Sequence, residues 1–201
     1  MRPKFAANIM ESRRYDVVVI GCSTGGLEAL RIVLGALPAT FPLPILVVCH
    51  TALGAEGLLV ELLGRSCVLT VREAVEKQSI APGVVVLASP GYHLLLEKDL
   101  TLSFSADLKV CGARPAIDVL FESAADAVGE RLIGIVLTGA NNDGSRGLLA
   151  IRQTGGVGIV QDPVTAVAPE MPQAALDIAG ADYVFLLSEI APFLMRLVEE
   201  G

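Results

Sequence analysis

Residues 16–26 read DVVVIGCSTGG, and this stretch decides the fold class. Residues 16–20 are a β-branched run that ends at Gly21, which is typical of a strand buried on both faces. From residue 25 to residue 37 the apolar side chains return at helical spacing, and Pro38 ends that pattern. A buried strand followed at once by an amphipathic helix is the unit from which α/β proteins are built.

The alternation of strand and helix continues along the chain. We expect further strands over residues 45–49, 68–73, 84–88, 132–137, 156–160 and 183–187. We expect further helices over residues 56–63, 116–128, 145–153, 172–178 and 190–199. Residues 93–97 and 101–105 are joined by a short turn and predict one antiparallel hairpin. The chain is therefore predicted to be a doubly wound α/β protein, a mostly parallel sheet flanked by helices.

Composition and domain organisation agree with one globular unit. Residues 1–14 are polar and aperiodic and are interpreted as a flexible leader, and residues 15–201 as a single domain. The chain is 53% hydrophobic but only 4% aromatic, so its core must be aliphatic. A net charge of −7 without a basic stripe argues against nucleic acid and anionic membranes as partners. No secretory signal and no membrane-spanning apolar run is found, which predicts a cytoplasmic protein.

The residues that could carry chemistry follow the predicted strands, where parallel sheets bind their ligands. Ser23 lies in Gly-x-Ser-x-Gly between the first strand and the first helix, a pattern typical of a nucleophile elbow. Two alternatives exist. Ser23 or Thr24 could cap the helix, which is a far commoner role, or the glycines could hold a nucleotide phosphate. The phosphate alternative is weakened because neither a Walker loop nor Gly-x-Gly-x-x-Gly is present.

A base and an acid are predicted at the same edge. His50 closes the second strand and is the candidate general base, with His93 as its rival. Asp143 lies in the glycine-rich segment after the strand at 132–137, where it could orient an imidazole or cap the next helix. The order serine, histidine, acid excludes the α/β-hydrolase class, in which the acid precedes the histidine.

The cysteines and histidines predict no metal site and no cofactor. The four cysteines are scattered without metal-ligand spacing, and only two histidines are present. We interpret the cysteines as reduced, mostly buried thiols. Cys22 and Cys49 directly precede Ser23 and His50, so an oxidation-sensitive site is the alternative to a simple packing role.

Five motifs, taken together, carry a family resemblance. Residues 20–26, 47–50, 114–121, 137–144 and 170–172 read IGCSTGG, VVCH, RPAIDVLF, LTGANNDG and EMP. In this order and at this spacing they resemble the catalytic domain of CheB, the chemotaxis receptor methylesterase family. The resemblance extends from about residue 15 to the end of the sequence.

The resemblance implies a doubly wound fold and an enzyme that removes methyl groups from glutamate side chains on the cytoplasmic helices of chemoreceptors. Some members also deamidate glutamine. It implies Ser23 as nucleophile, His50 as general base and Asp143 as orienting acid. Backbone N–H groups near Thr24 and Ala140 fall at the implied oxyanion site. Methylated chemoreceptors and a receptor methyltransferase are the implied partners.

The chain departs from the family pattern in three respects. Chemotaxis enzymes usually carry an N-terminal receiver domain, for which 201 residues leave no room, so the chain resembles free-standing members. Ala140-Asn141 replace Met-Gly, and Cys49 replaces the usual Gln before the histidine. These two changes leave the triad residues intact. They lie beside the triad, where they affect which substrate the site can bind. Two alternatives therefore stay open: a docking module of the same fold without turnover, and a hydrolase of small-molecule esters.

Overall fold

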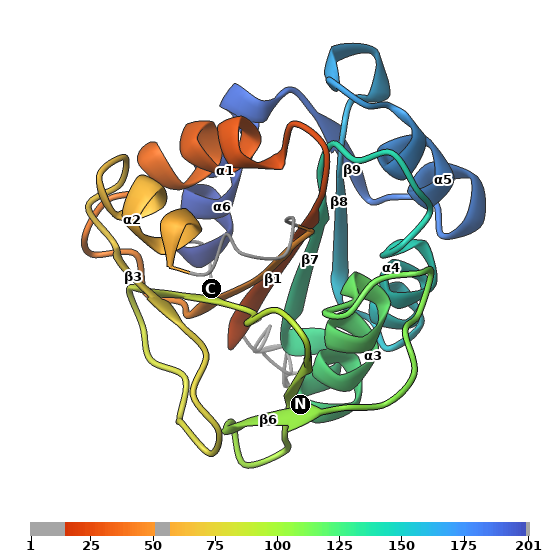
Figure 1. Ribbon diagram of the computed structural model, residues 1–201. Helices are drawn as coiled ribbons and strands as arrows, with labels where there is room; N and C mark the ends of the chain where they lie inside the picture. Colours follow the sequence, from red (N-terminus) through yellow and green to blue (C-terminus); the bar gives the residue numbers. More distant parts are fainter. Residues whose placement is uncertain (1–14, 51–56, 200–201) are drawn as a thin grey trace, which may run out of the picture.

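A computed structural model describes residues 15–50 and 57–199, and all elements named below lie within these ranges. Seven parallel strands form one sheet in the order β3-β4-β2-β1-β7-β8-β9 (Figure 1). They are β1 Val17–Cys22, β2 Ile45–Cys49, β3 Thr70–Glu73, β4 Val84–Leu87, β7 Leu132–Val136, β8 Val157–Gln161 and β9 Tyr183–Phe185. A separate antiparallel pair consists of β5 His93–Leu96 and β6 Leu102–Ser105. The predicted fold class, including the single hairpin, is confirmed.

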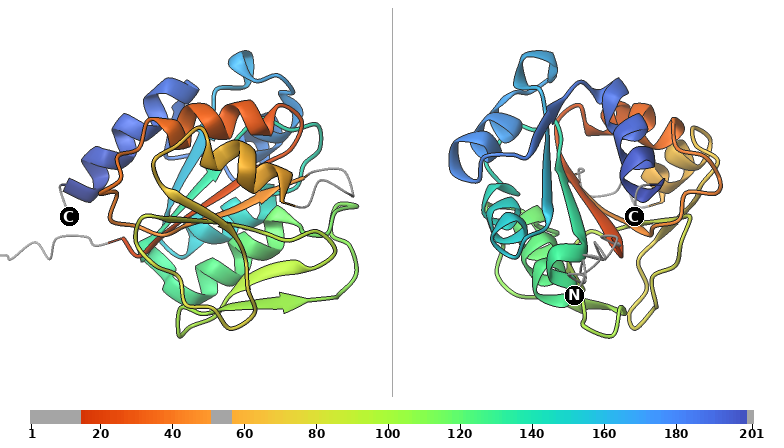
Figure 2. Two further views of the ribbon diagram at one scale, coloured as in Figure 1. Left: turned by 60° about the vertical axis from the view of Figure 1, so that its left-hand side comes forward. Right: turned by 180° about the vertical axis from the view of Figure 1, so that it is seen from behind.

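Helices cover both faces of the sheet. One layer consists of α1 Gly26–Gly35, α2 Leu58–Gly64 and α6 Leu187–Glu199 (Figure 1). The opposite layer consists of α3 Ile117–Val128, α4 Ser145–Gln153 and α5 Glu170–Ile178, as the rear view of Figure 2 also shows. Two short 3-10 turns, η1 Gly129–Arg131 and η2 Pro163–Thr165, precede β7 and α5.

The central strand β1 explains why the sequence shows a continuous apolar run here instead of an alternation. Val18 and Ile20 pack into the core under α1 and α6, whereas Val17 and Val19 pack into the core under α3 and α4. All four side chains have no exposed surface. Successive side chains of a strand point to opposite faces, and both faces of β1 are covered.

The largest boundary difference concerns the end of the chain. The sequence pattern predicts a strand over residues 183–187 and a helix from residue 190. In the structure β9 ends at Phe185, and α6 already begins at Leu187. The reason is local capping: the Glu189 carboxylate accepts a hydrogen bond from the Leu186 N–H at 2.9 Å, as in one half of a capping box.

Smaller differences affect other predicted boundaries. The helix predicted from residue 116 begins at Ile117, because Ala116 has an extended backbone and is the N-cap of α3. The helix predicted over residues 56–63 is observed as α2, Leu58–Gly64, with residue 56 outside the described ranges. The predicted leader, residues 1–14, also lies outside them. Among the helices that the structure describes, none combines the length and the apolar run that a bilayer crossing requires.

The topology fixes where a ligand site is expected. Strand β1 lies between β2 and β7, so the connections leave it toward opposite halves of the sheet. Such a switch point opens a crevice beyond the carboxyl ends of the strands. The segments that follow β1, β2 and β7 meet there, and they contain Ser23, His50 and Asp143.

Candidate active site

The three candidate residues are positioned by the ends of neighbouring strands. Ser23 directly follows β1, and its N–H donates to the Thr138 carbonyl beyond β7 at 2.9 Å. His50 directly follows β2, and its N–H donates to the Cys22 carbonyl at 3.0 Å. These bonds continue the sheet ladder past the strand ends. They hold the backbone of the serine and that of the histidine in fixed register.

The histidine and the acid form a direct pair. His50 Nε2 lies 2.9 Å from Asp143 Oδ2, with 15% of the His50 side chain exposed and none of Asp143. Asp143 also accepts hydrogen bonds from the N–H groups of Ile117 and Asp118, at 2.8 and 2.9 Å. These are the first two residues of α3, where a helix best stabilises a negative charge. The buried carboxylate is therefore compensated by three donors.

This arrangement excludes one of the two predicted roles of Asp143. Helix α4 has Gly144 as its N-cap, without a side-chain hydrogen bond, so the prediction that Asp143 caps this helix is wrong. The carboxylate instead accepts hydrogen bonds from the first two residues of α3, a helix that lies 25 to 26 residues earlier in the sequence. Because the carboxylate accepts from Nε2, the His50 ring keeps Nδ1 as the nitrogen with a free lone pair.

Ser23 lies at the same cavity as His50. Ser23 and His50 both line one cavity, although within the described residues no hydrogen bond joins their side chains. The prediction that Ser23 or Thr24 caps α1 is wrong, since the cap residue is Gly25 and no side chain bonds the helix end. Gly25 has a φ of 79°, the left-handed region that glycine adopts most easily, so the turn before α1 is as sharp as an elbow requires.

The rival base, His93, has a structural position. Its side chain is buried with 1% of its surface exposed. Nδ1 accepts a hydrogen bond from the Ala116 N–H at 3.2 Å, and Nε2 lies 3.1 Å from the Leu108 carbonyl. Both ring nitrogens are thus occupied, Nδ1 as acceptor and Nε2 as donor. His93 fixes the start of α3 and has no nitrogen left for a substrate.

The two predicted oxyanion residues lie at the surface of the same edge. Thr24 and Ala140 are both exposed. Across the described part of the chain, neither backbone N–H has an acceptor. The Thr24 carbonyl accepts from the Thr138 hydroxyl at 2.8 Å, which ties the turn after β1 to the loop after β7. Their oxyanion role stays a prediction.

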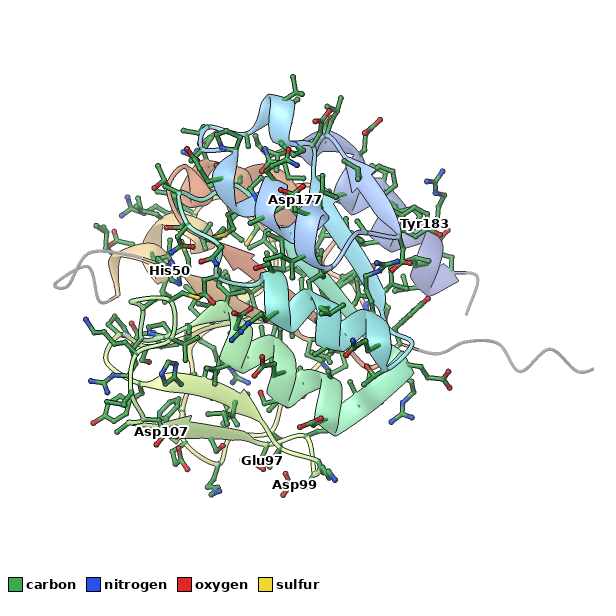
Figure 3. All side chains as sticks on the ribbon, turned by 90° about the vertical axis from the view of Figure 1, so that its right-hand side faces the viewer. His50, Glu97, Asp99, Asp107, Asp177 and Tyr183 are labelled. Atoms are coloured by element: carbon green, nitrogen blue, oxygen red, sulfur yellow. The ribbon has the colours of Figure 1, made fainter. Side chains whose placement is uncertain are left out.

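Two cavities meet at the histidine. The first, about 400 Å3, lies between α1 and α2 and has mostly apolar walls that include Ser23, Leu27, Leu58 and Leu62. The second, about 480 Å3, lies beyond β4 and has more polar walls that include Lys109, Arg114 and Asn141. Cys49 and His50 belong to both walls. Figure 3 shows His50 at this edge of the molecule, away from the β5-β6 hairpin that carries Glu97.

Comparison with known proteins identifies the family. The family model described as CheB methylesterase matches residues 18–194. The chain belongs to the CheB methylesterase family. A "putative protein-glutamate methylesterase/protein-glutamine glutaminase" of Leptospira interrogans is 44% identical over 91% of this chain and 95% of its own length. A protein-glutamate methylesterase/protein-glutamine glutaminase of Moorella thermoacetica is 41% identical over 91% of this chain but 44% of its own length.

A solved structure supports the same assignment. The crystal structure of the CheB methylesterase catalytic domain of Thermotoga maritima matches with a TM-score of 0.87 and 34% sequence identity. The match covers 92% of this chain and 99% of that domain. The family resemblance inferred from the five sequence motifs is therefore confirmed.

Two buried polar residues of this CheB methylesterase domain were missed by the sequence reasoning about the site. Gln161, at the end of β8, accepts a hydrogen bond from the Thr138 N–H through its side chain at 2.9 Å. Asp118, in the first turn of α3, accepts from the N–H groups of Gly144 and Gly147 at 2.9 and 2.8 Å. Asp118 and Gln161 are at most 2% exposed. They fasten the loop that carries Asp143 to β8 and to α3.

One group of possible metal ligands is present among the described residues. Ligand atoms of Cys111, Asp118 and Asp143 lie within 4.8 Å of one another. Asp143 already accepts hydrogen bonds from His50 and from the start of α3, and Asp118 Oδ1 from the start of α4. These carboxylates thus have a role in the site that does not involve a metal ion.

Proposed function

We propose that this chain is a protein-glutamate methylesterase in which Ser23, His50 and Asp143 form the catalytic triad. The observation that carries the proposal is the His50 Nε2 to Asp143 Oδ2 contact of 2.9 Å, beside a serine on a glycine-rich elbow. The imidazole is held by a buried carboxylate, and it lines the same cavity as the serine. Acyl transfer needs these three groups in this arrangement. Family membership supplies the ester chemistry.

The reaction follows from the positions of the proton donors and acceptors. His50 Nδ1 takes the proton of the Ser23 hydroxyl while the serine oxygen attacks the ester carbonyl. Asp143 stabilises the imidazolium that forms, and the imidazolium then protonates the departing methoxide to methanol. Water, deprotonated by the same nitrogen, attacks the acyl-serine and releases the glutamate carboxylate. The serine proton leaves with methanol, and the proton that His50 takes from the water restores the Ser23 hydroxyl when the acyl bond breaks.

The negative charge that develops on the carbonyl oxygen needs donors. We infer that the backbone N–H groups of Thr24 and Ala140 supply them, because neither has an acceptor in the part of the chain described. The start of α1 adds the positive end of a helix dipole at the same place. Both donors belong to backbone groups, so the Ala140 side chain does not enter the interaction.

The proposed substrate is a methylated glutamate in the cytoplasmic region of a chemoreceptor, and the proposed location is the cytoplasm. The names of the Leptospira and Moorella relatives include protein-glutamine glutaminase as well as methylesterase. An amide and an ester pass through the same acyl-serine, so we propose glutamine deamidation as a second reaction of this site. A receptor methyltransferase, which forms the ester, is the proposed functional counterpart.

The test compares Ser23→Ala with Ser188→Ala, an exposed serine on α6 that serves as matched control. Ser23→Ala should lower methanol release from methylated receptor by at least about a thousandfold and abolish labelling by a fluorophosphonate probe. Circular dichroism should stay unchanged, because no hydrogen bond of the described residues involves the Ser23 hydroxyl. Parental turnover in Ser23→Ala would overturn the triad.

The same experiment separates the alternatives. A docking module would give no fluorophosphonate adduct at Ser23 and no methanol. The apolar cavity of about 400 Å3 is of a size that holds a small molecule, which favours a small-ester hydrolase as the second candidate. Turnover of a model ester without release of methanol from methylated receptor would favour that candidate.

A further inference from the structure

Cys22 and Cys49 form a contact pair that the proposed reaction does not use. They are the last residues of β1 and β2 and are paired in register. A Cβ placed on Gly26 would lie 2.7 Å from the sulfur of Cys22 and 3.3 Å from that of Cys49. Both thiols therefore point to the same side of the sheet, against the first residue of α1.

The two thiols differ in access to solvent. Cys22 is fully buried, whereas Cys49 is half-buried and lines both cavities beside His50. The neighbouring Cys22 thiol lowers the pKa of the Cys49 thiol, and the contact with Cys49, together with burial, raises the pKa of Cys22. Reactive cysteines are accessible thiols with thiolate character beside a second, resolving cysteine.

The spacing of the pair permits a covalent bond. Neighbouring strands of a sheet lie about 4.8 Å apart, within the Cα separation of roughly 4.4–6.8 Å found for disulfides. We propose that Cys49 and Cys22 form a disulfide in response to a peroxide and that this bond switches off the adjacent Ser23–His50 site. The inhibitory effect depends on the proposed function, whereas formation of the bond does not.

The chemistry balances with hydrogen peroxide as oxidant. The Cys49 thiolate attacks one peroxide oxygen, the O–O bond breaks, and the products are a sulfenic acid and, after protonation, water. The Cys22 thiol then attacks the Cys49 sulfur, the S–O bond breaks, and hydroxide leaves with the Cys22 proton as a second water. Two thiols have lost two electrons, and one peroxide has become two waters. A dithiol reductant reverses the change.

The bond would act on the site through the strand ends. Ser23 directly follows one cysteine, and His50 directly follows the other. Joining the sulfurs reorients both side chains and shifts the two backbones that carry the nucleophile and the base, and it removes the Cys49 thiol from the walls of both cavities. Misplacement of catalytic groups by about 1 Å costs on the order of a hundredfold in rate. We therefore expect at least about a tenfold loss of esterase activity.

The test uses the purified full chain treated with hydrogen peroxide, followed by alkylation and trypsin digestion. Cleavage after lysine and arginine leaves the four cysteines on separate peptides, residues 15–31, 32–65, 66–72 and 110–131. The expected products are a linked pair of peptides 15–31 and 32–65 and the stated loss of activity, with both reversed by dithiothreitol. Cys22→Ser and Cys49→Ser should each prevent the link. The double variant Cys67→Ser, Cys111→Ser is the matched control and should keep it.

Several outcomes would overturn the proposal. Full alkylation of peptides 15–31 and 32–65 after peroxide would exclude the bond. A link to residue 67 or 111 would assign the oxidation elsewhere, and a correct link with unchanged activity would exclude the switch. The mass readout does not depend on turnover. A link that forms in a protein without any esterase activity would therefore contradict only the proposed function.

Discussion

At the residue scale, Asp118 and Asp143 are two buried carboxylates of unequal environment. Both oxygens of Asp143 accept hydrogen bonds. Asp118 Oδ1 accepts two backbone bonds, but within the described residues Oδ2 has no partner. Burial, and to a lesser degree the charge of Asp143, raises the pKa of Asp118, although the N–H groups of Gly147 and Gly144 oppose the shift. Asp118 thus holds the loop of Asp143 with a carboxyl group whose pKa is raised by burial.

This difference predicts a pH-dependent stability. A carboxyl whose pKa is raised in the folded chain binds its proton more readily there than in the unfolded chain. Stability is therefore lost as the pH rises from the ordinary aspartate pKa, about 4, through the raised value. Asp118→Asn cannot lose a proton, and its amide oxygen can still accept from Gly144 and Gly147. The unfolding free energy of the variant should therefore rise relative to that of the parent over this interval.

Urea denaturation from about pH 4 to neutral measures this difference. Asp126→Asn, which changes an exposed aspartate on the same helix, is the matched control. The difference in unfolding free energy between this variant and the parent should not show the rise with pH that is expected for Asp118→Asn. The amide NH2 that replaces Oδ2 adds a constant offset, so only the slope is diagnostic. A slope of the opposite sign for Asp118→Asn would contradict the assignment.

At the scale of elements, the close crossing of α3 and α4 keeps the acid in place. Gly147 in α4 lies against α3 so closely that an added Cβ would overlap Phe121 and come within 3.1 Å of the Asp118 backbone. The same glycine donates its N–H to Asp118. Neither helix can move away without loss of that bond. The helix contact and the position of Asp143 are therefore linked.

Gly147→Ala should destabilise the fold by about 1–3 kcal/mol, because overpacking forces the two helices apart. Fluorophosphonate labelling of Ser23 should also slow, since the loop of Asp143 moves with α4. Gly64→Ala in α2 is the matched control: nothing lies within 4 Å of an added Cβ, and alanine favours the helix. Urea midpoints and labelling rates measure both effects. Equal stability of the two variants would show that the crossing tolerates a side chain.

The sequence predicts the elements whose signals are local. Continuous aliphatic runs such as residues 17–20 identify strands because both faces of the sheet are covered. The start of the last helix at Leu187 is missed because residues 183–187 look like one strand in the sequence. In the structure the hydrogen bond from the Leu186 N–H to Glu189 starts the helix inside that run. Strand-end reasoning brings His50 and Asp143 to one edge, and the structure pairs them.

The missed site residues depend on contacts distant in sequence. Asp118 near the start of a helix is typical of a solvated or dipole-stabilising position, whereas its partners lie 26 and 29 residues further on. Gln161 and Thr138 likewise meet only because β7 and β8 are neighbours. A polar residue at the end of an otherwise apolar strand, as at Gln161, is the one sequence signal that could have identified such a residue.

At the scale of the whole molecule, the two helical layers pack against opposite faces of the same strands. Val18 and Ile20 of β1 belong to one core and Val19 to the other, and the site lies where this strand ends. A sheet packed on both faces cannot release one layer of helices without exposing half of its apolar strand surface to water. We therefore expect the two layers to unfold in one transition.

Val19→Ala tests this coupling, because the change touches only the core under α3 and α4. It should cost about 2 kcal/mol as a small cavity in a fully buried site. In native-state hydrogen exchange the slowest amides of α1 and α6, on the far face, should lose as much protection as those of α3 and α4, roughly thirtyfold. Val68→Ala, at a position 68% exposed, is the control and should change neither layer. Loss of protection confined to α3 and α4 would mean that the layers unfold separately. The Ser23–His50 edge between them would then open by sub-global unfolding instead of only with the whole fold.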